Sequence, residues 1–80
     1  MEEYVMRSTL AVRLRNKRRE KGLSAEALSK KSDVAASSIR KYEMGIVVPS
    51  VLAVMYLAEV LEVTIDWLVG RDDYNKEGTT

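Results

Sequence analysis

Apolar residues recur along this chain at the three- and four-residue spacing of helices, separated by short polar breaks. Leu10 and Leu14 stand one helical turn apart. The i, i+3, i+4, i+7 spacing of a core-facing helix is kept by Val54, Leu57, Ala58 and Leu61. No stretch alternates apolar and polar residues as a half-buried strand would. The pattern therefore predicts an all-α chain.

Capping residues and breakers divide the chain into five predicted helices. They span about Thr9 to Lys21, Ala25 to Lys31, Ala36 to Met44, Val51 to Glu62, and Ile65 up to Gly70. The predicted N-caps are Ser8 or Thr9, Ser24, Ser50 and Thr64, whereas the third helix follows Ala35, which has no side-chain oxygen to cap it. Asp tolerates left-handed dihedrals, so Asp33 can turn the chain between the second and third helices. In the fifth helix, we expect Trp67 or Leu68 to be buried.

Five short helices joined by tight turns predict one all-α five-helix bundle. Eighty residues leave no room for a second domain. We assign residues 1–8 to an N-terminal arm, 9–70 to the domain and 71–80 to a polar, flexible tail. The longest uncharged stretch, residues 44–58, contains Gly45 and Pro49 and is shorter than the roughly 20 residues that span a bilayer. The start is acidic, unlike a secretory signal, so we expect a cytoplasmic protein without a membrane partner.

The absence of Cys and His excludes most catalytic chemistry. Without them there is no disulfide, no Cys/His zinc site, no thiol nucleophile and no imidazole base. Carboxylates at Asp66, Asp72 and Asp73 lie at a predicted helix start and in a polar tail, with no pocket-forming sequence around them. We therefore expect no enzymatic activity, no metal and no cofactor.

The net charge of +1 conceals two opposed halves. Residues 7–41 contain eleven Lys and Arg against three acidic residues, for a local charge of +8, whereas residues 42–80 carry −5. Such asymmetry indicates a polyanionic partner, because Lys and Arg that neutralise phosphates release condensed counterions. A solvated helix face explains a basic run equally well, so the function has to come from the architecture.

The stretch from Ala25 to Arg40 has the layout of a helix-turn-helix. Residues 10–70 resemble the phage Cro and repressor type of helix-turn-helix DNA-binding domain, often called XRE-like and built on the lambda-repressor-like five-helix bundle. The resemblance is carried by the segment RREKGLSAEALSKKSDVAASSIRKYEMG from Arg18 to Gly45, by Pro49-Ser50, by Leu57-Ala58 and Leu61, and by the segment VTIDWL from Val63 to Leu68.

This resemblance implies a sequence-specific regulator of transcription in a prokaryote or phage, more specifically a repressor that binds double-stranded DNA as a homodimer on a palindromic operator. The third helix would read bases in the major groove through Ala35, Ala36, Ser37, Arg40 and Lys41. Contacts to the DNA backbone would come from Arg15, Lys17, Ser24, Ala25, Glu26, Lys30, Ser38, Gly45 and Ile46. Arg40 suits a guanine because its fork matches O6 and N7, but a phosphate contact is an equal alternative.

The resemblance also implies two structural features. Arg18 and Glu43 would form an ion pair that ties the first helix to the end of the third. A homodimer seam would pass through Val48, Ile65, Leu68 and Val69. The alternative is that a small bundle buries these apolar residues as core.

Two departures from the family pattern leave a second function open. The place where the family usually has a Gln that reaches DNA is Ala25, and the usual Ser or Thr cap of the third helix is Ala35. The loop after the third helix is apolar where the family often has phosphate-binding residues. The alternative function is a protein-interaction module on the same scaffold, like an antitoxin or antirepressor, with weak or non-specific DNA binding.

Overall fold

A long N-terminal helix packs against two of the four shorter helices that follow it in the chain. The structure is a computed structural model that describes residues 2–71, and over this range it contains five helices and no strand. They are α1 (Glu3–Glu20), α2 (Ala25–Ser32), α3 (Ala36–Met44), α4 (Val51–Leu61) and α5 (Ile65–Val69). The predicted all-α five-helix bundle is confirmed.

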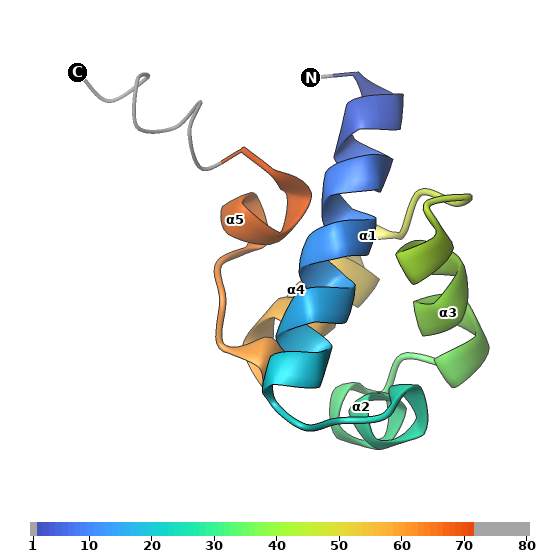
Figure 1. The fold of residues 1–80 in the computed structure, drawn as a ribbon, viewed down its shortest axis with the longest axis vertical. Helices are drawn as coiled ribbons and strands as arrows, with labels where there is room; N and C mark the ends of the chain where they lie inside the picture. The colour runs from blue at the N-terminus through green and yellow to red at the C-terminus, as the bar shows by residue number, and fades with distance from the viewer. Residues whose placement is uncertain (1, 72–80) are drawn as a thin grey trace.

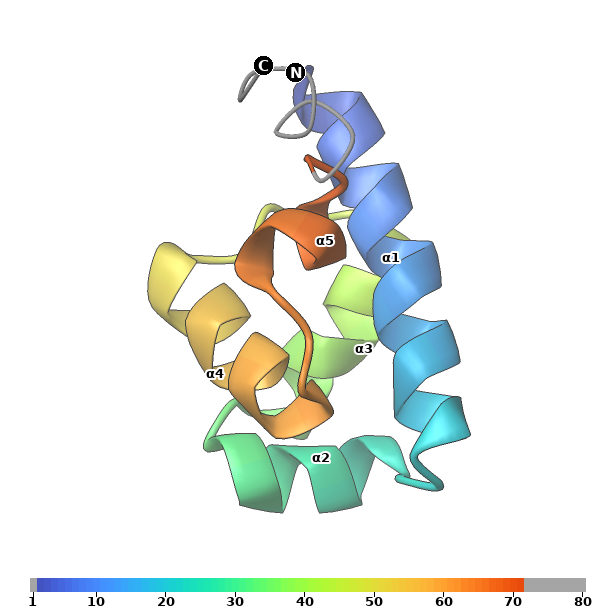
Figure 2. The same cartoon turned by 90° about the vertical axis from the view of Figure 1, so that its left-hand side faces the viewer.

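Figure 1 shows which helices flank α1. α3 lies along one flank of α1 and α5 along the other, while α2 closes the bottom of the bundle. Turned by 90°, α4 stands beside α5 and above α2 (Figure 2). Helix α1 is therefore the common support for the helix-turn-helix on one side and for α5 on the other.

Side-chain caps fix where three of the helices begin. The side-chain oxygens of Ser24, Ser50 and Thr64 accept hydrogen bonds from the backbone N–H three residues on, at 3.0, 3.1 and 3.0 Å. Each bond satisfies an N–H that has no partner inside the helix. Ala35 makes no such bond to α3, and no other side chain provides it.

Helix α1 begins six residues earlier than predicted. We expected it to start near Thr9 after an arm of residues 1–8, but residues 3–8 are helical and the N-cap is Glu2. An ion pair one turn apart, Arg7 Nε to Glu3 Oε2 at 3.8 Å, supports this first turn, and an acidic residue there suits the helix dipole. Partly buried Met6 extends the Leu10 stripe by one turn. The predicted tail lies, except for Arg71, outside the described residues.

The core is a single cluster, aliphatic except for Tyr42, that draws side chains from every helix. Seven have no exposed surface: Leu10, Leu14, Leu28, Ile39, Leu57, Leu61 and Leu68. Burying an aliphatic side chain of this size stabilises the fold by roughly 1.5–3 kcal/mol relative to leaving it exposed. Of the two candidates in α5, Leu68 is the fully buried one and Trp67 packs at the edge of the core. Within the described range, no helix is long and apolar enough to cross a membrane.

Candidate nucleic-acid interface

Helices α2 and α3 are joined by a three-residue turn, Asp33 to Ala35. Asp33 adopts the left-handed conformation at φ 65°, which reverses the chain after α2. Val34 is then 7% exposed and packs into the core, while the Ser32 hydroxyl accepts a 3.2 Å hydrogen bond from the Val34 N–H. The buried Val34 side chain and the hydrogen bond to Ser32 thus anchor the turn to the core, which fixes the angle between the two helices.

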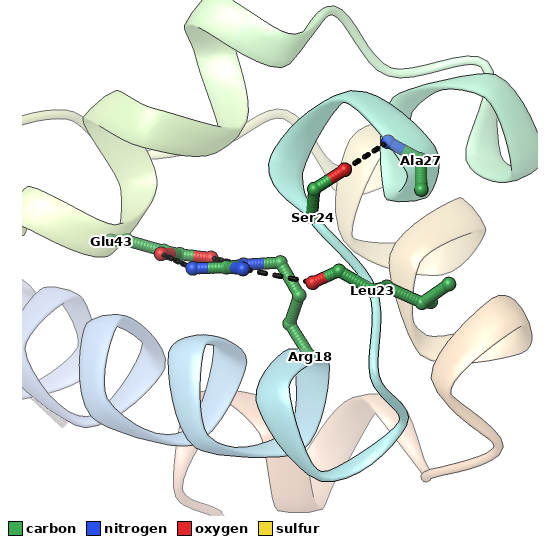
Figure 3. A network of polar contacts seen from close by, with 5 residues as sticks. All are labelled: Arg18, Leu23, Ser24, Ala27 and Glu43. Carbon is green, nitrogen blue, oxygen red and sulfur yellow. Dashed lines mark hydrogen bonds and ion pairs between the residues drawn. The ribbon is translucent and has the colours of Figure 1, made fainter.

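An ion pair between α1 and α3 locks this unit to the rest of the bundle (Figure 3). Arg18 Nε and Nη2 donate to the two carboxylate oxygens of Glu43 at 2.7 and 2.9 Å. Arg18 Nη1 donates to the carbonyl oxygen of Leu23 at 2.9 Å, next to the N-cap of α2. The two side chains are only 14% and 11% exposed. One guanidinium therefore joins α1, the start of α2 and the end of α3.

The hydrogen bond to Glu43 raises the pKa of Arg18 above its ordinary value, and burial opposes this effect only in part. The guanidinium is thus charged at any pH at which the protein is handled. Arg18 is permanently charged and three of its nitrogens already donate hydrogen bonds within the protein, so its role is structural. These bonds leave Arg18 with little capacity to bind a ligand.

The outer face of α3 is polar and basic. Ile39 and Tyr42 are buried, so the opposite side of the helix faces solvent. Of the residues expected to read bases, Ala35, Ser37, Arg40 and Lys41 are exposed, and Ala36 is half-buried. The structure therefore places the predicted base-reading positions on one continuous surface.

Arg40 is held by a residue of α2. Its Nη2 forms an ion pair with Glu26 Oε2, and the two side chains are 53% and 61% exposed. The sequence predicted Glu26 only as a contact to the DNA backbone, and its contact with Arg40 was missed. The two residues lie on different helices, so helical spacing carries no signal for the pair. Only the angle between α2 and α3 brings them together.

The predicted backbone contacts divide between two sides of the molecule. Ser24 caps α2, and Ala25 and Glu26 are its first two residues. Lys30 and Ile46 are exposed, while Ser38 and Gly45 are half-buried. Arg15 lies on the flank of α1 that also carries Arg18, because helix positions advance by 100° per residue. Lys17 lies on the opposite flank.

Lys17 faces α5 instead of the helix-turn-helix. Its Nζ lies 5.4 Å from the centre of the Trp67 ring and pairs with Glu20 Oε1 at 2.6 Å. The Lys17 hydrogen bond lowers the pKa of Glu20, as a bond from Lys21 lowers that of Glu62. The structure does not bring Lys17 together with the other predicted DNA contacts.

An apolar groove lies between the N-terminal part of α1, the start of α4 and α5. It has a volume of about 270 Å³ and is lined by Met6, Val48, Pro49, Val51, Val54, Ile65 and Val69. Val51, Val48 and Ile65 are 74, 47 and 42% exposed. Three of the four residues predicted for a dimer seam line this groove. The fourth, Leu68, was wrongly placed: it has no exposed surface, because it points into the core from the short α5.

Acidic side chains were the remaining candidates for a metal site. Residues 2–71 contain no group of three or more acidic side chains, the only ligand types this chain could offer, close enough together to hold a metal ion. Asp66, one of the carboxylates considered from the sequence, lies in the first turn of α5. Asp72 and Asp73 fall outside the described residues.

Comparison with known proteins places this geometry in a family. The model of the HTH_3 family, described as helix-turn-helix, matches residues 14–68. A crystal structure of an HTH_3 family transcriptional regulator from Vibrio cholerae superposes with a TM-score of 0.78 at 24% sequence identity. That match covers 89% of this chain but 40% of the other, so the chain spans less than half the length of that regulator. Among curated proteins, none matches the chain significantly.

Proposed function

This chain belongs to the HTH_3 helix-turn-helix family, and from that premise we propose that it is a sequence-specific, double-stranded DNA-binding regulator of transcription. The observation that carries the proposal is the exposed polar and basic face of α3. The turn before α3 and the ion pair between Arg18 and Glu43 fix the orientation of this helix. In a helix-turn-helix, such a face enters the major groove while the preceding helix rests on the backbone.

In this proposal the readout falls to few side chains. Ser37, Arg40 and Lys41 supply the hydrogen bonds to bases, and Ala35 and Ala36 supply methyl contacts of the kind that thymine accepts. The DNA backbone is contacted by the N-terminus of α2 and by Lys30, Ser38, Gly45, Ile46 and Arg15. Lys17 would contribute only if it left the Trp67 ring and Glu20.

The finer proposal is a repressor that binds a palindromic operator as a homodimer and blocks access to the DNA. The apolar groove supports it, since side chains as exposed as Val48, Val51 and Ile65 lose contact with water when a second copy covers them. A two-fold protein on a two-fold site doubles the contacts and sets the half-site spacing.

Selection of bound duplexes from a random pool tests the DNA proposal. We expect a palindromic consensus, and we expect the double variant Arg40→Ala, Lys41→Ala to lose most of its preference for that consensus. The control variant Arg19→Ala, Lys21→Ala removes the same charge from the C-terminal end and C-cap of α1 and should keep the preference. A pool without any consensus would refute sequence-specific binding.

The dimer is tested by the mass of the protein in solution. Ile65→Glu places a charge in the groove and should yield monomers with reduced operator affinity. Val12→Glu makes the same change at a 51% exposed position on the solvent face of α1 and should leave the dimer intact. Equal masses for wild type and Ile65→Glu would contradict a seam at this groove.

The second candidate function is a protein-interaction module. It is favoured by the methyl side chains at Ala25, Ala35 and Ala36, where hydrogen-bonding readout is missing, together with the exposed apolar groove. Flat affinity across DNA sequences, with stoichiometric capture of a protein partner that Ile65→Glu abolishes, would establish this function in place of the first.

A further inference from the structure

The ion pair between Glu26 and Arg40 spans the two helices of the helix-turn-helix on its solvent side. Glu26 is the second residue of α2 and Arg40 is the fifth residue of α3. Both side chains are more than half exposed, so burial does not force them together. The pair lies on the surface where the proposed base-reading residues are gathered.

A comparison with Arg18 shows how much binding capacity Arg40 keeps. Three nitrogens of Arg18 donate to Glu43 and Leu23, and only 14% of that side chain is exposed. A guanidinium has five N–H donors in a rigid fork, and Nη2 of Arg40 is the atom that meets Glu26. At 53% exposure, Arg40 has donors left on the solvent side for a second acceptor.

The carboxylate also changes which acceptor Arg40 prefers. A phosphate drawn to Arg40 would come close to the negative charge of Glu26, and like charges at short range repel. A guanine presents neutral acceptors, O6 and N7, and suffers far less of this repulsion. The pair therefore restricts the torsion angles of Arg40 and weakens the phosphate contact relative to the base contact.

We propose that Glu26 is a specificity-determining residue that acts through Arg40, because its carboxylate holds the guanidinium toward a guanine and disfavours phosphate. The proposal rests on the proposed DNA-binding function and deepens it. Glu26 touches no base in this arrangement and is a positioning residue. Its effect is to lower affinity for all DNA and to raise discrimination between sequences.

The test compares Glu26→Gln with wild type on two duplexes. One is the selected consensus, and the other has adenine in place of the guanine at which Arg40→Ala relaxes the preference. An exposed ion pair is worth about a two- to fivefold change in an equilibrium constant. We therefore expect the guanine preference of Glu26→Gln to fall by about two- to fivefold, while affinity for random DNA rises by a similar factor.

Two controls separate positioning from charge. Glu20→Gln makes the same charge change on α1, next to Lys17, and should leave the guanine preference unchanged. In an Arg40→Ala background, Glu26→Gln should no longer alter the preference. Thermal unfolding of each variant checks that the fold is retained. We expect little change, because the carboxylates of Glu20 and Glu26 are both exposed.

The outcomes distinguish this inference from the function on which it rests. Wild-type protein without any sequence preference would overturn both. A preference that depends on Arg40 but is unchanged in Glu26→Gln would overturn the role of Glu26 alone. A sequence preference in which no guanine position depends on Arg40 would also overturn the role of Glu26, since Glu26 is proposed to act only through Arg40.

Discussion

Arg13 of α1 holds Trp67 of α5 by two contacts at once. Its Nη1 donates a hydrogen bond of 2.5 Å to the Trp67 carbonyl oxygen, and its guanidinium carbon lies 4.8 Å from the centre of the Trp67 ring. Helix α5 has only five residues, too few to be stable alone. Its position on α1 therefore depends on this contact together with the buried Leu68.

Removal of the Arg13 guanidinium should loosen α5. We expect Arg13→Met, which keeps much of the apolar stem, to lower the free energy of unfolding by about 1–2 kcal/mol, the combined scale of a cation–π contact and a hydrogen bond. Urea denaturation measures the change, and Trp67 emission reports it locally because the chain has one Trp. Arg19→Met, on the exposed side of α1, is the control, and an equal effect there would contradict this role for Arg13.

The pair of Arg18 and Glu43 should behave as a unit. Glu43→Leu alone leaves a largely buried guanidinium without its carboxylate, and we expect a loss of about 3 kcal/mol in unfolding free energy, the lower end of the range for a broken buried ion pair, because both side chains keep some exposure. Arg18→Met combined with Glu43→Leu restores neutrality and should be more stable than Glu43→Leu alone. A double-mutant cycle measured by urea denaturation checks this. Strict additivity of the two single changes would show that the residues are not coupled.

Stability should fall in acid through the exposed carboxylates at Glu20 and Glu62. Hydrogen bonds from Lys17 and Lys21 lower their pKa values below the ordinary 4.5 in the folded protein. A carboxyl whose folded pKa is depressed contributes stability above its unfolded pKa and loses it as pH falls through the folded pKa. The raised pKa of Arg18 acts in the opposite direction and only at strongly alkaline pH.

Lys21→Met should therefore flatten the decline in stability below pH 4.5. Because the Glu62 side chain is 75% exposed, added salt should screen its contact with Lys21 and flatten the wild-type curve in the same way. Thermal denaturation between about pH 5 and 3, on either side of the unperturbed carboxyl pKa, measures both effects. A decline that stays as steep in Lys21→Met would assign the acid sensitivity to other groups.

Glycine is required at position 70 for two reasons and at position 22 for one. Both residues have positive φ, +85° and +71°. A Cβ added at Gly70 would lie 2.7 Å from Cγ2 of Thr9, whereas one at Gly22 would meet nothing within 4 Å. We expect Gly22→Ala to cost about 1 kcal/mol from the left-handed backbone alone, and Gly70→Ala about 2–4 kcal/mol.

Thr9→Ser distinguishes the two costs at Gly70. It removes the methyl group nearest to the added Cβ, so it should recover part of the loss in Gly70→Ala but not the backbone part. Thermal unfolding of the two single variants and the combination measures this. No recovery would show that the backbone conformation accounts for the whole cost.

The helices and the core were largely predictable, because their signals are local. A helix start such as Ser50 and a helix end such as Gly45 can be recognised from single residues. The buried face of α4 follows from the helical spacing of its apolar residues. The start of α1 was missed because Ser8 resembles an N-cap more than Glu2 does. Met6 carried a usable signal, since it stands four residues before Leu10.

Site geometry was less predictable, because it depends on angles between helices. The contact between Glu26 and Arg40 exists only once the turn at Asp33 has set the angle between α2 and α3. Lys17 was predicted to contact the DNA backbone, although its position one turn after Arg13 puts it on the α5 flank. Charge indicated a polyanion partner, and helical phase was needed to choose the residues.

Helix α1 carries Arg18 toward α3 and Arg13 toward α5, on two flanks of one continuous rod. Its tolerance of genetic change should accordingly be uneven. Substitutions at the exposed positions Val12, Asn16 and Arg19 leave both flanks in place. A single-codon insertion or deletion between positions 14 and 18 would rotate one flank by 100° against the other. Length variation among related genes should therefore avoid this segment, even where its exposed positions vary.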